Sequence, residues 1–360
     1  MSQKQDRVEK KKPTFENTTK VVIEKAGSYE RLQIRTAPTR APGPHEVLID
    51  VKASGVNYAD VIVRMGLYAS AKELVGWPIT PGFEVAGVVE AVGSKVTDLE
   101  VGARVVAVTL FNGYASKLVA PRHQVFALPE ALDFVAGASI PAVFLTAHFA
   151  LHNLAHPRKT DHVLIHSAAG GVGGSLVQLA KLAGCTVTGV VGRTQKIETA
   201  REHGCDHVID KSKQDLWREA EKLAPKGFDV ILDANGIATL GKSYEHLARP
   251  GKLVVYGFST MMPKTGGRPN YLKLAADYIR TPRFNPLDMT NESRSVMAFN
   301  LSYLFDRTDI LEEAMGDIMG WLAEGKITPP PATTYEMARV ADAHRDIESG
   351  KTVGKLVLVP

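Results

Sequence analysis

Cysteine is scarce in this sequence: only Cys185 and Cys205 occur among 360 residues. Two thiols cannot build a disulfide framework, and they cannot supply the four ligands of a structural cysteine zinc site. This usage is typical of proteins in reducing compartments, so we expect a cytoplasmic location.

Neither sign of charge is in large excess, because 43 Lys and Arg residues face 39 Asp and Glu residues and leave a net charge of +4. A nucleic-acid-binding chain usually has a larger or more clustered basic excess, so no nucleic-acid partner is expected. No stretch of about 18 apolar residues occurs, and residues 1–20 lack the apolar core of a secretory signal. We therefore expect no transmembrane segment.

Hydrophobic residues make up 44% and charged residues 23% of the chain, as in ordinary globular proteins. At roughly 150 residues per domain, the length predicts two or three domains. Residues 1–19 are expected to form a flexible tail before the first strand. The basic cluster Lys10–Lys12 in this tail is either simply solvated or a peripheral contact with an acidic membrane surface.

The segment from Lys20 to Pro129 alternates short β-forming runs with Gly and Pro turns. This alternation of short strands and turns predicts a compact all-β or barrel-like domain. Strands are expected at Lys20–Ile23, Glu46–Ala53, Glu84–Val92, Arg104–Thr109 and Tyr114–Val119.

From about Asp161 strands and helices alternate, which is typical of a parallel, doubly wound sheet. Strands are expected at His162–His166, Thr186–Val191, His207–Ile209, Phe228–Asp233 and Lys252–Phe258, and helices at Ser175–Ala183, Lys196–His203 and Tyr244–Ala248. The C-terminal stretch predicts helices at Asp309–Ala323 and Met337–Ser349 and a strand at Lys355–Val359. With this strand the chain is expected to return to the first domain.

A glycine-rich motif, Ala168-Ala169-Gly170-Gly171-Val172-Gly173, follows the first of these strands and opens a helix. On the dinucleotide fingerprint G-x-G-x-x-G, Ala168 takes the first glycine position, Gly170 the second and Gly173 the third. The second glycine lets the backbone approach a pyrophosphate, and the helix N-terminus attracts that anion. The motif predicts a Rossmann-type cofactor site, with a glycine turn that serves packing alone as the alternative.

The choice of cofactor depends on the end of the second strand, where NAD-binding folds usually place an acidic residue about 20 positions after the glycines. Here that place holds Gly192 and Arg193, with Lys196 close behind and no carboxylate. Arg pairs with a phosphate in bidentate fashion, so the sequence favours NADPH over NADH. The alternative for the two cations is a solvated helix start.

Several segments resemble the medium-chain dehydrogenase/reductase superfamily, namely Ala53–Asp60 with Arg64, Gly66 and Tyr68, and Pro81–Val89. Pro141 with Leu145-Thr146-Ala147, the Ala168–Gly173 motif and Val353–Pro360 are similar to its quinone oxidoreductase (zeta-crystallin-like) group. Arg283–Met289 and Phe299–Leu304 are similar to the synaptic-vesicle-membrane-protein-like branch of that group. The match extends from about Val21 to the C-terminus.

The resemblance implies the α/β fold class with two domains and an active cleft between them. Residues 20–144 and 306–360 are expected to form a GroES-like β-barrel domain. Residues 145–305 are expected to form a Rossmann domain with a doubly wound parallel sheet. Members of the superfamily usually pair through their cofactor domains, so a homodimer is expected.

The resemblance also bears on the metal, since zinc-dependent relatives have a cysteine where this chain has Asn57 and a histidine where it has Phe83. Neither residue type is a ligand of catalytic zinc, so we expect no metal and disfavour a zinc-type alcohol dehydrogenase. Hydride delivery from NADPH to an electrophilic quinone or α,β-unsaturated carbonyl (enone) needs no Lewis acid, and this is the expected activity. The alternative is a nucleotide-binding protein that acts on a lipid or membrane partner.

By position, Asn57 and Tyr68 are the implied catalytic residues. The Asn57 amide either donates to a substrate carbonyl or ties a turn, and the Tyr68 hydroxyl either orients substrate or belongs to a packed aromatic. Asp60 and Arg64 are four residues apart and are expected to form a structural ion pair.

The implied cofactor contacts run along both halves of the dinucleotide. They are Asn57, Thr146, Gly170, Gly171, Val172, Gly192, Arg193, Lys196, Lys211, Asn235, Gly257, Phe258, Phe299, Leu301 and Lys355. Lys211 is either a contact of the adenosine phosphate or a solvated side chain. Apolar candidates for the substrate pocket are Ile62, Leu67, Leu74, Trp77, Phe144, Met261 and Met262.

Overall fold

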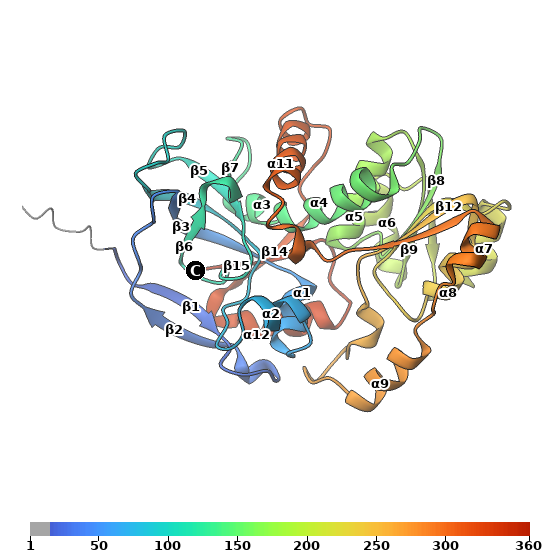
Figure 1. The fold of residues 1–360 in the computed structure, drawn as a ribbon, viewed down its shortest axis with the longest axis horizontal. Helices are drawn as coiled ribbons and strands as arrows, with labels where there is room; N and C mark the ends of the chain where they lie inside the picture. Colours follow the sequence, from blue (N-terminus) through green and yellow to red (C-terminus); the bar gives the residue numbers. More distant parts are fainter. Residues whose placement is uncertain (1–14) are drawn as a thin grey trace, which may run out of the picture.

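The computed structural model describes residues 15–360, and Figure 1 shows two β-sheets on either side of the central helix α4 (Pro141–His148). Most of residues 1–19, including the cluster Lys10–Lys12, lies outside the described residues. The expectation of a flexible tail therefore stays a prediction.

The first sheet has seven strands in the order β14-β15-β3-β4-β5-β7, with β6 also paired to β3. Their bounds are β3 Glu46–Val56, β4 Glu84–Val92, β5 Arg104–Val108, β6 Lys117–Pro121, β7 Val125–Ala127, β14 Ala332–Glu336 and β15 Lys355–Val359. Val47, Ile49 and Val51 alternate along β3 and are buried, so one face of the strand lies on a core. A separate antiparallel pair joins β1 (Thr18–Val22) and β2 (Gln33–Ala37).

The last strand brings the end of the chain back to this first sheet. Strand β15 pairs antiparallel with β3 and parallel with β14, and it begins more than 300 residues after β3 begins. The division into domains at residues 144/145 and 305/306 remains a proposal, and α4 runs across the first of these points.

The second sheet has six strands, all parallel, in the order β10-β9-β8-β11-β12-β13. Their bounds are β8 His162–His166, β9 Thr186–Val191, β10 His207–Asp210, β11 Phe228–Asp233, β12 Leu247–Val255 and β13 Arg294–Ala298. The prediction of a parallel, doubly wound sheet is confirmed. The strand order reverses between β8 and β11, and open α/β sheets bind ligands at such a switch point.

Helices connect and cover the strands. The α-helices besides α4 are α1 Tyr58–Arg64, α2 Ala69–Leu74, α3 Phe134–Ala138, α5 Gly171–Leu182, α6 Ile197–Glu202, α7 Leu216–Leu223, α8 Leu240–Glu245, α9 Tyr271–Arg280, α10 Pro286–Glu292, α11 Thr308–Ala323 and α12 Val340–Glu348. The short helices are η1 Tyr29–Arg31, η2 Arg122–Gln124, the π-helix η3 Phe149–Ala155, η4 Thr194–Lys196, η5 Ser259–Met261, η6 Leu301–Leu304 and η7 Met337–Arg339. The helix expected at Tyr244–Ala248 lies earlier in the chain, as α8, because the buried Leu247 already pairs with Phe228 as the start of β12.

The expected ion pair between Asp60 and Arg64 is also wrong. Arg64 pairs with Glu348 of α12 at 2.5 Å, and both side chains are fully buried. Asp60 instead accepts hydrogen bonds from the backbone N–H groups of Asn57 and Gly82, both at 2.8 Å. Helical spacing alone predicted the pair, while α12 reaches α1 only through the tertiary fold.

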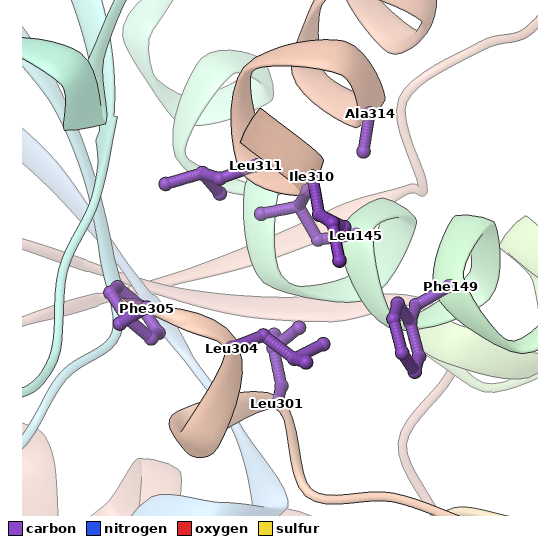
Figure 2. A pocket seen from close by; sticks show the side chains of 8 residues that line it. All are labelled: Leu145, Phe149, Leu301, Leu304, Phe305, Ile310, Leu311 and Ala314. Carbon is purple, nitrogen blue, oxygen red and sulfur yellow. The ribbon is translucent and has the colours of Figure 1, made fainter. Parts of the chain in front are cut away.

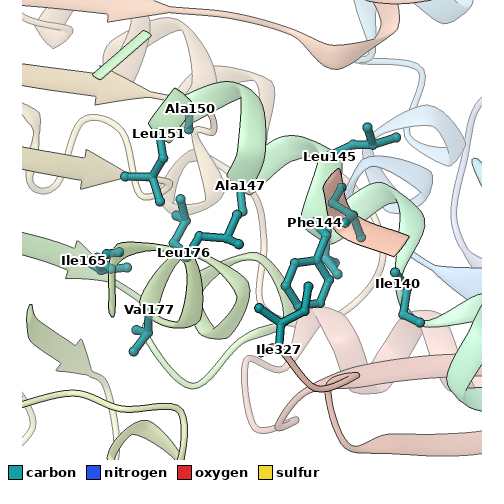
Figure 3. Packing of buried hydrophobic residues seen from close by; sticks show 14 of the residues in the cluster. Ile140, Phe144, Leu145, Ala147, Ala150, Leu151, Ile165, Leu176, Val177 and Ile327 are labelled. Atoms are coloured by element: carbon teal, nitrogen blue, oxygen red, sulfur yellow. The ribbon is translucent and has the colours of Figure 1, made fainter. Parts of the chain in front are cut away.

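Helix α4 lies between the two sheets and contacts both α5 and α11. A small apolar crevice remains where α4 meets η6 and α11, lined by Leu145, Phe149, Leu301, Leu304, Phe305, Ile310, Leu311 and Ala314 (Figure 2). On the other side of α4, Ala147 points toward Leu176 of α5 and Phe144 toward Ile327, all in one continuous core (Figure 3). The position of α4 therefore depends on apolar packing from both sides.

Phe144→Ala tests this packing. The side chain is 0% exposed, and we expect the substitution to lower the free energy of unfolding by about 3–5 kcal/mol because it removes apolar contacts and leaves a cavity. Urea unfolding measures the change. The control is Leu272→Ala, whose side chain is 85% exposed and whose loss is expected to change stability by no more than about 0.5 kcal/mol. Equal small losses in both variants would contradict the packing account.

Candidate cofactor and substrate cleft

A cleft of about 540 Å³ lies between the two sheets, at the switch point of the parallel sheet. Many of the residues predicted from the sequence line it together, although they come from widely separated segments. These are Asn57, Tyr68, Thr146, Gly170, Gly171, Val172, Gly257, Phe258, Phe299 and Leu301. The other predicted residues, Gly192, Arg193, Lys196, Lys211, Asn235 and Lys355, lie outside this lining set.

The glycine turn joins β8 to α5 and forms one end of the cleft. Gly170 precedes the first helical residue of α5, and its N–H donates to the Ser167 carbonyl at 2.9 Å. A Cβ on Gly173 would stand 2.1 Å from the Ser167 oxygen, so only glycine allows this approach of helix to strand. The free N–H groups at the start of α5 form a site suited to an anion.

Cations gather at the carboxyl ends of β9 and β10. Arg193 and Lys211 are exposed there, and Lys264 lies close enough to Lys211 to affect it. Partial loss of water around its ammonium group, and then the charge of Lys264, lower the pKa of Lys211. Burial, and then the positive charge of Arg193, lower the pKa of Lys196. Such mutual repulsion favours a bound anion, and the sequence analysis missed Lys264 because it lies far along the chain.

Lys196 also joins the two halves of the molecule. Its Nζ donates to the carbonyls of Gly350 at 3.0 Å and Thr352 at 2.6 Å, between α12 and β15. Two of its three N–H donors are therefore used within the protein.

A carboxylate that the sequence analysis missed stands near these cations. Asp210 at the end of β10 accepts from the Thr194 hydroxyl at 2.6 Å and from the Ser212 hydroxyl at 2.7 Å. These hydrogen bonds are the main cause that lowers its pKa. Asp210 thus braces the turn that carries Arg193.

Beside the glycine turn, the end of β11 is held by Asp233. Its carboxylate accepts from the backbone N–H groups of Asn235 at 2.8 Å and Gly236 at 3.0 Å. Asn235 is buried, and its Nδ2 has no hydrogen-bond partner among residues 15–360. Buried donors of this kind normally bond to a protein group, to water or to a ligand.

At the opposite end of the cleft, Tyr68 reaches across to the parallel-sheet half of the molecule. Its hydroxyl donates to Asn300 Oδ1 at 2.9 Å and lies 3.0 Å from Ser302 Oγ. Its ring packs edge-on against Phe83, with centroids 5.8 Å apart. Burial raises the pKa of Tyr68, so the hydroxyl remains a donor at neutral pH. Asn300 and Ser302 were not predicted as site residues, although both lie in the Phe299–Leu304 segment.

The other catalytic candidate, Asn57, precedes α1 and lines the cleft. Its backbone N–H donates to Asp60. Its side chain contacts Glu84 and Lys355, so Lys355 lies immediately behind the cleft. Burial raises the pKa of Asp60 to about 7 against three hydrogen bonds, including one from Tyr114, that oppose the rise.

The wall between the two ends is mainly apolar. Of the predicted pocket residues, Ile62, Leu67 and Met262 line the cleft, whereas Phe144 belongs to the core. Leu74, Trp77 and Met261 are not part of the lining either. Leu301 and Phe305 also line the crevice beside α4 (Figure 2), so the two spaces share a wall.

Comparisons with known proteins agree with this architecture. Residues 43–139 match the model of the alcohol dehydrogenase GroES-like domain, and residues 203–358 match that of zinc-binding dehydrogenases. The synaptic vesicle membrane protein VAT-1 homolog of Rattus norvegicus is 33% identical over 344 residues, which cover 94% of this chain and 83% of that protein. The chain belongs to the medium-chain dehydrogenase/reductase family.

Solved structures of this dehydrogenase/reductase family share the fold over nearly the whole chain. The Escherichia coli quinone oxidoreductase complexed with NADPH has a TM-score of 0.82 at 27% identity, covering 95% of this chain and all of that one. The CurK enoyl reductase has a TM-score of 0.82 at 26% identity, covering 96% and 99%. The predicted quinone oxidoreductase group, its synaptic-vesicle-membrane-protein-like branch, the GroES-like domain and the α/β fold class are confirmed. The chain is an oxidoreductase of this type, and the alternative with a lipid or membrane partner is not favoured.

The positions that hold zinc ligands in metal-dependent members are Asn57 and Phe83 here, and both line the cleft. Within residues 15–360, no three His, Cys, Asp or Glu side chains form a group that could hold a metal ion. The same described part of the chain has no helix long and apolar enough to cross a membrane.

His166, at the end of β8, predicts a pH dependence of stability. Burial lowers its pKa to about 4 against the opposing charge of Asp233, and its Nε2 lies 3.1 Å from Ser243 Oγ. Because the unfolded chain binds this proton below about pH 6.5 and the folded chain does not, stability is lost as the pH falls. Between pH 7 and 5 this one group is expected to cost about 1–2 kcal/mol.

Urea unfolding at both pH values, followed by tryptophan fluorescence, measures the loss. In His166→Gln the difference between the two pH values should shrink by about that amount. An unchanged difference would show that His166 is protonated as easily in the folded chain as in the unfolded one.

Proposed function

We propose that this chain is an NADPH-dependent reductase that delivers hydride to a quinone or an α,β-unsaturated carbonyl compound without a metal ion. The proposal rests on the different chemistry of the two ends of the cleft. One end offers backbone N–H groups at the start of α5, and the other offers the hydroxyl of the half-buried Tyr68 in an apolar wall. The similarity to a quinone oxidoreductase complexed with NADPH supports it.

The residues at the nucleotide end fit a phosphorylated dinucleotide. The N–H groups of Gly171 and Val172 are suited to the pyrophosphate, and the unpartnered Nδ2 of Asn235 is a donor that a bound ligand would satisfy. Arg193 and Lys211 are suited to the 2′-phosphate, to which Lys196 adds its one remaining N–H. The edge at Gly192 is open, since a Cβ there would meet only Lys211 Cε, at 3.6 Å.

Toward the substrate end, Thr146, Gly257, Phe258, Phe299 and Leu301 would line the nicotinamide half of the cofactor. NADPH, when bound, supplies the hydride; the chain supplies position, exclusion of water and hydrogen bonds.

Tyr68 has the properties that the proposed reaction requires of the chain. When a quinone or enone accepts hydride, negative charge develops on its carbonyl oxygen, and a donor fixed at that point stabilises the charge. Tyr68 stays protonated at neutral pH and donates its single O–H hydrogen to Asn300 Oδ1. A substrate oxygen would take this hydrogen bond in place of Asn300, while Ser302 Oγ, 3.0 Å away, helps to hold the Tyr68 oxygen. The remaining N–H of Asn57 is a second donor in the same cleft.

The direct test is NADPH oxidation, measured at 340 nm with a panel of quinones and enones. We expect turnover that a chelator does not reduce, and a fall in kcat of about 10²-fold in Tyr68→Phe, because one donor to the developing oxyanion is lost. Tyr335→Phe is the control, since that hydroxyl bonds Asp346 on the surface. If no acceptor accelerates NADPH oxidation, the proposal fails.

Cofactor selection is tested by Arg193→Ala. Loss of the guanidinium should raise the KM for NADPH by about 10-fold or more, because a charge-assisted hydrogen bond to the 2′-phosphate is lost, and should leave the KM for NADH unchanged. Arg201→Ala, an exposed cation on the following helix α6, is the matched control. An equal rise in KM for both cofactors would show that Arg193 does not bind the 2′-phosphate.

A further inference from the structure

We propose that Glu84 and Lys355 are positioning residues that hold the side-chain amide of Asn57 in a single orientation, with one N–H left for an oxygen acceptor of the substrate. This inference rests on the proposed reductase function and deepens it. It gives the buried ion pair between Glu84 and Lys355, directly behind the cleft, a role in orienting a substrate-facing side chain.

The three side chains form one hydrogen-bonded group. Asn57 Nδ2 donates to Glu84 Oε1 at 2.8 Å, and Lys355 Nζ donates to Asn57 Oδ1 at 2.5 Å. The ammonium also lies 2.5 Å from Glu84 Oε1. Glu84 is fully buried and the Lys355 side chain is only 3% exposed, whereas Asn57 lines the cleft.

The chemistry of these partners decides which way the amide faces. An ammonium can only donate and a carboxylate can only accept, so Asn57 must turn its oxygen to Lys355 and its nitrogen to Glu84. A flipped amide would set N–H against ammonium and oxygen against carboxylate. With one amide hydrogen used by Glu84, the second is the only side-chain donor that Asn57 can offer to the cleft.

Two further features of the fold fix the position of the Glu84 carboxylate. Glu84 begins β4, and its second oxygen accepts from the N–H of Ala142 in the first turn of α4 at 2.7 Å. A Cβ on Gly55 would stand 2.3 Å from Glu84 Oε1, so glycine is required opposite the carboxylate. A buried ion pair costs desolvation energy that apolar residues would avoid, so its presence here calls for a role beyond stability.

The consequence is a preference for substrates with an oxygen acceptor next to the reacting carbon. The Lys355 charge on the amide oxygen polarises the amide and strengthens the opposite N–H donor. A carbonyl oxygen that gains negative charge would receive this hydrogen bond, whereas an alkene without a carbonyl would leave the donor unpaired.

The test replaces the charged pair by the neutral pair Glu84→Gln with Lys355→Met, which keeps the volume and leaves no buried charge unpaired. Because the buried N–H of Ala142 keeps the glutamine oxygen, the glutamine turns its NH2 to Asn57, and the acceptor that holds the Asn57 nitrogen is lost. We expect kcat to fall about 10-fold, as for the loss of one oriented donor, while the Kd for NADPH, measured by fluorescence, changes less than about threefold.

A double-mutant cycle separates positioning from a general structural effect. Asn57→Ala alone should cost about 10-fold in kcat, and in the neutral-pair background it should cost less than about twofold, because the same interaction is already lost. Lys355→Arg should restore most of the activity that Lys355→Met removes. The control is Glu90→Gln with Lys117→Met, another pair at 2.5 Å, in the first sheet.

Two results would overturn the inference. Additive losses in the cycle would show that Glu84 and Lys355 act independently of Asn57. A large rise in the Kd for NADPH with kcat unchanged would make Lys355 a cofactor contact instead.

A measurement without turnover keeps the inference separate from the proposed function. In protein labelled with ¹⁵N-asparagine, the Asn57 side-chain amide, assigned by its loss in Asn57→Ala, should show two distinct protons that interchange slowly. In the neutral-pair variant the interchange should be at least about tenfold faster, because the amide is no longer held. Equal interchange in both proteins would contradict positioning, even if the chain reduces no acceptor in the panel.

Discussion

The buried carboxylate of Glu84 binds donors from three separate segments of the chain behind the cleft. Asn57 precedes α1, Ala142 lies in the first turn of α4 and Lys355 begins β15. A buried anion needs such donors to offset its loss of water, so these three elements cannot move apart independently. Since α4 also carries Thr146 and packs on α5, one interaction fixes the substrate side of the cleft relative to the nucleotide side.

The two ends of the cleft are built in different ways. The nucleotide end consists mainly of backbone: a glycine turn held against Ser167, a helix start and the end of β11 fixed by Asp233. The substrate end consists of side chains that reach across the molecule, with Tyr68 bonded to Asn300 and Ser302. Substitutions within the apolar wall can therefore alter the choice of substrate without disturbing the backbone groups suited to a dinucleotide.

Much of this arrangement is predictable from the sequence, because the motifs involved are local. The sequence around Gly170 predicts the strand–glycine–helix turn directly. The family resemblance correctly places Asn57 and Tyr68 in the cleft. Contacts between distant segments are not predictable in this way. Arg64 forms its ion pair with Glu348 and not with Asp60. The Tyr68 hydroxyl bonds to residues more than 230 positions away in the sequence. The position of Lys264 near Lys211 likewise depends on the tertiary fold.

The central claim is that the chain transfers hydride from NADPH into a carbon atom of its substrate. NADPH carrying deuterium at C4, prepared separately in its two stereochemical forms, tests this claim with an enone as acceptor and mass spectrometry of the product. The account predicts that one of the two forms places a single deuterium on the carbon β to the carbonyl. Reduced product without deuterium from either form would contradict it.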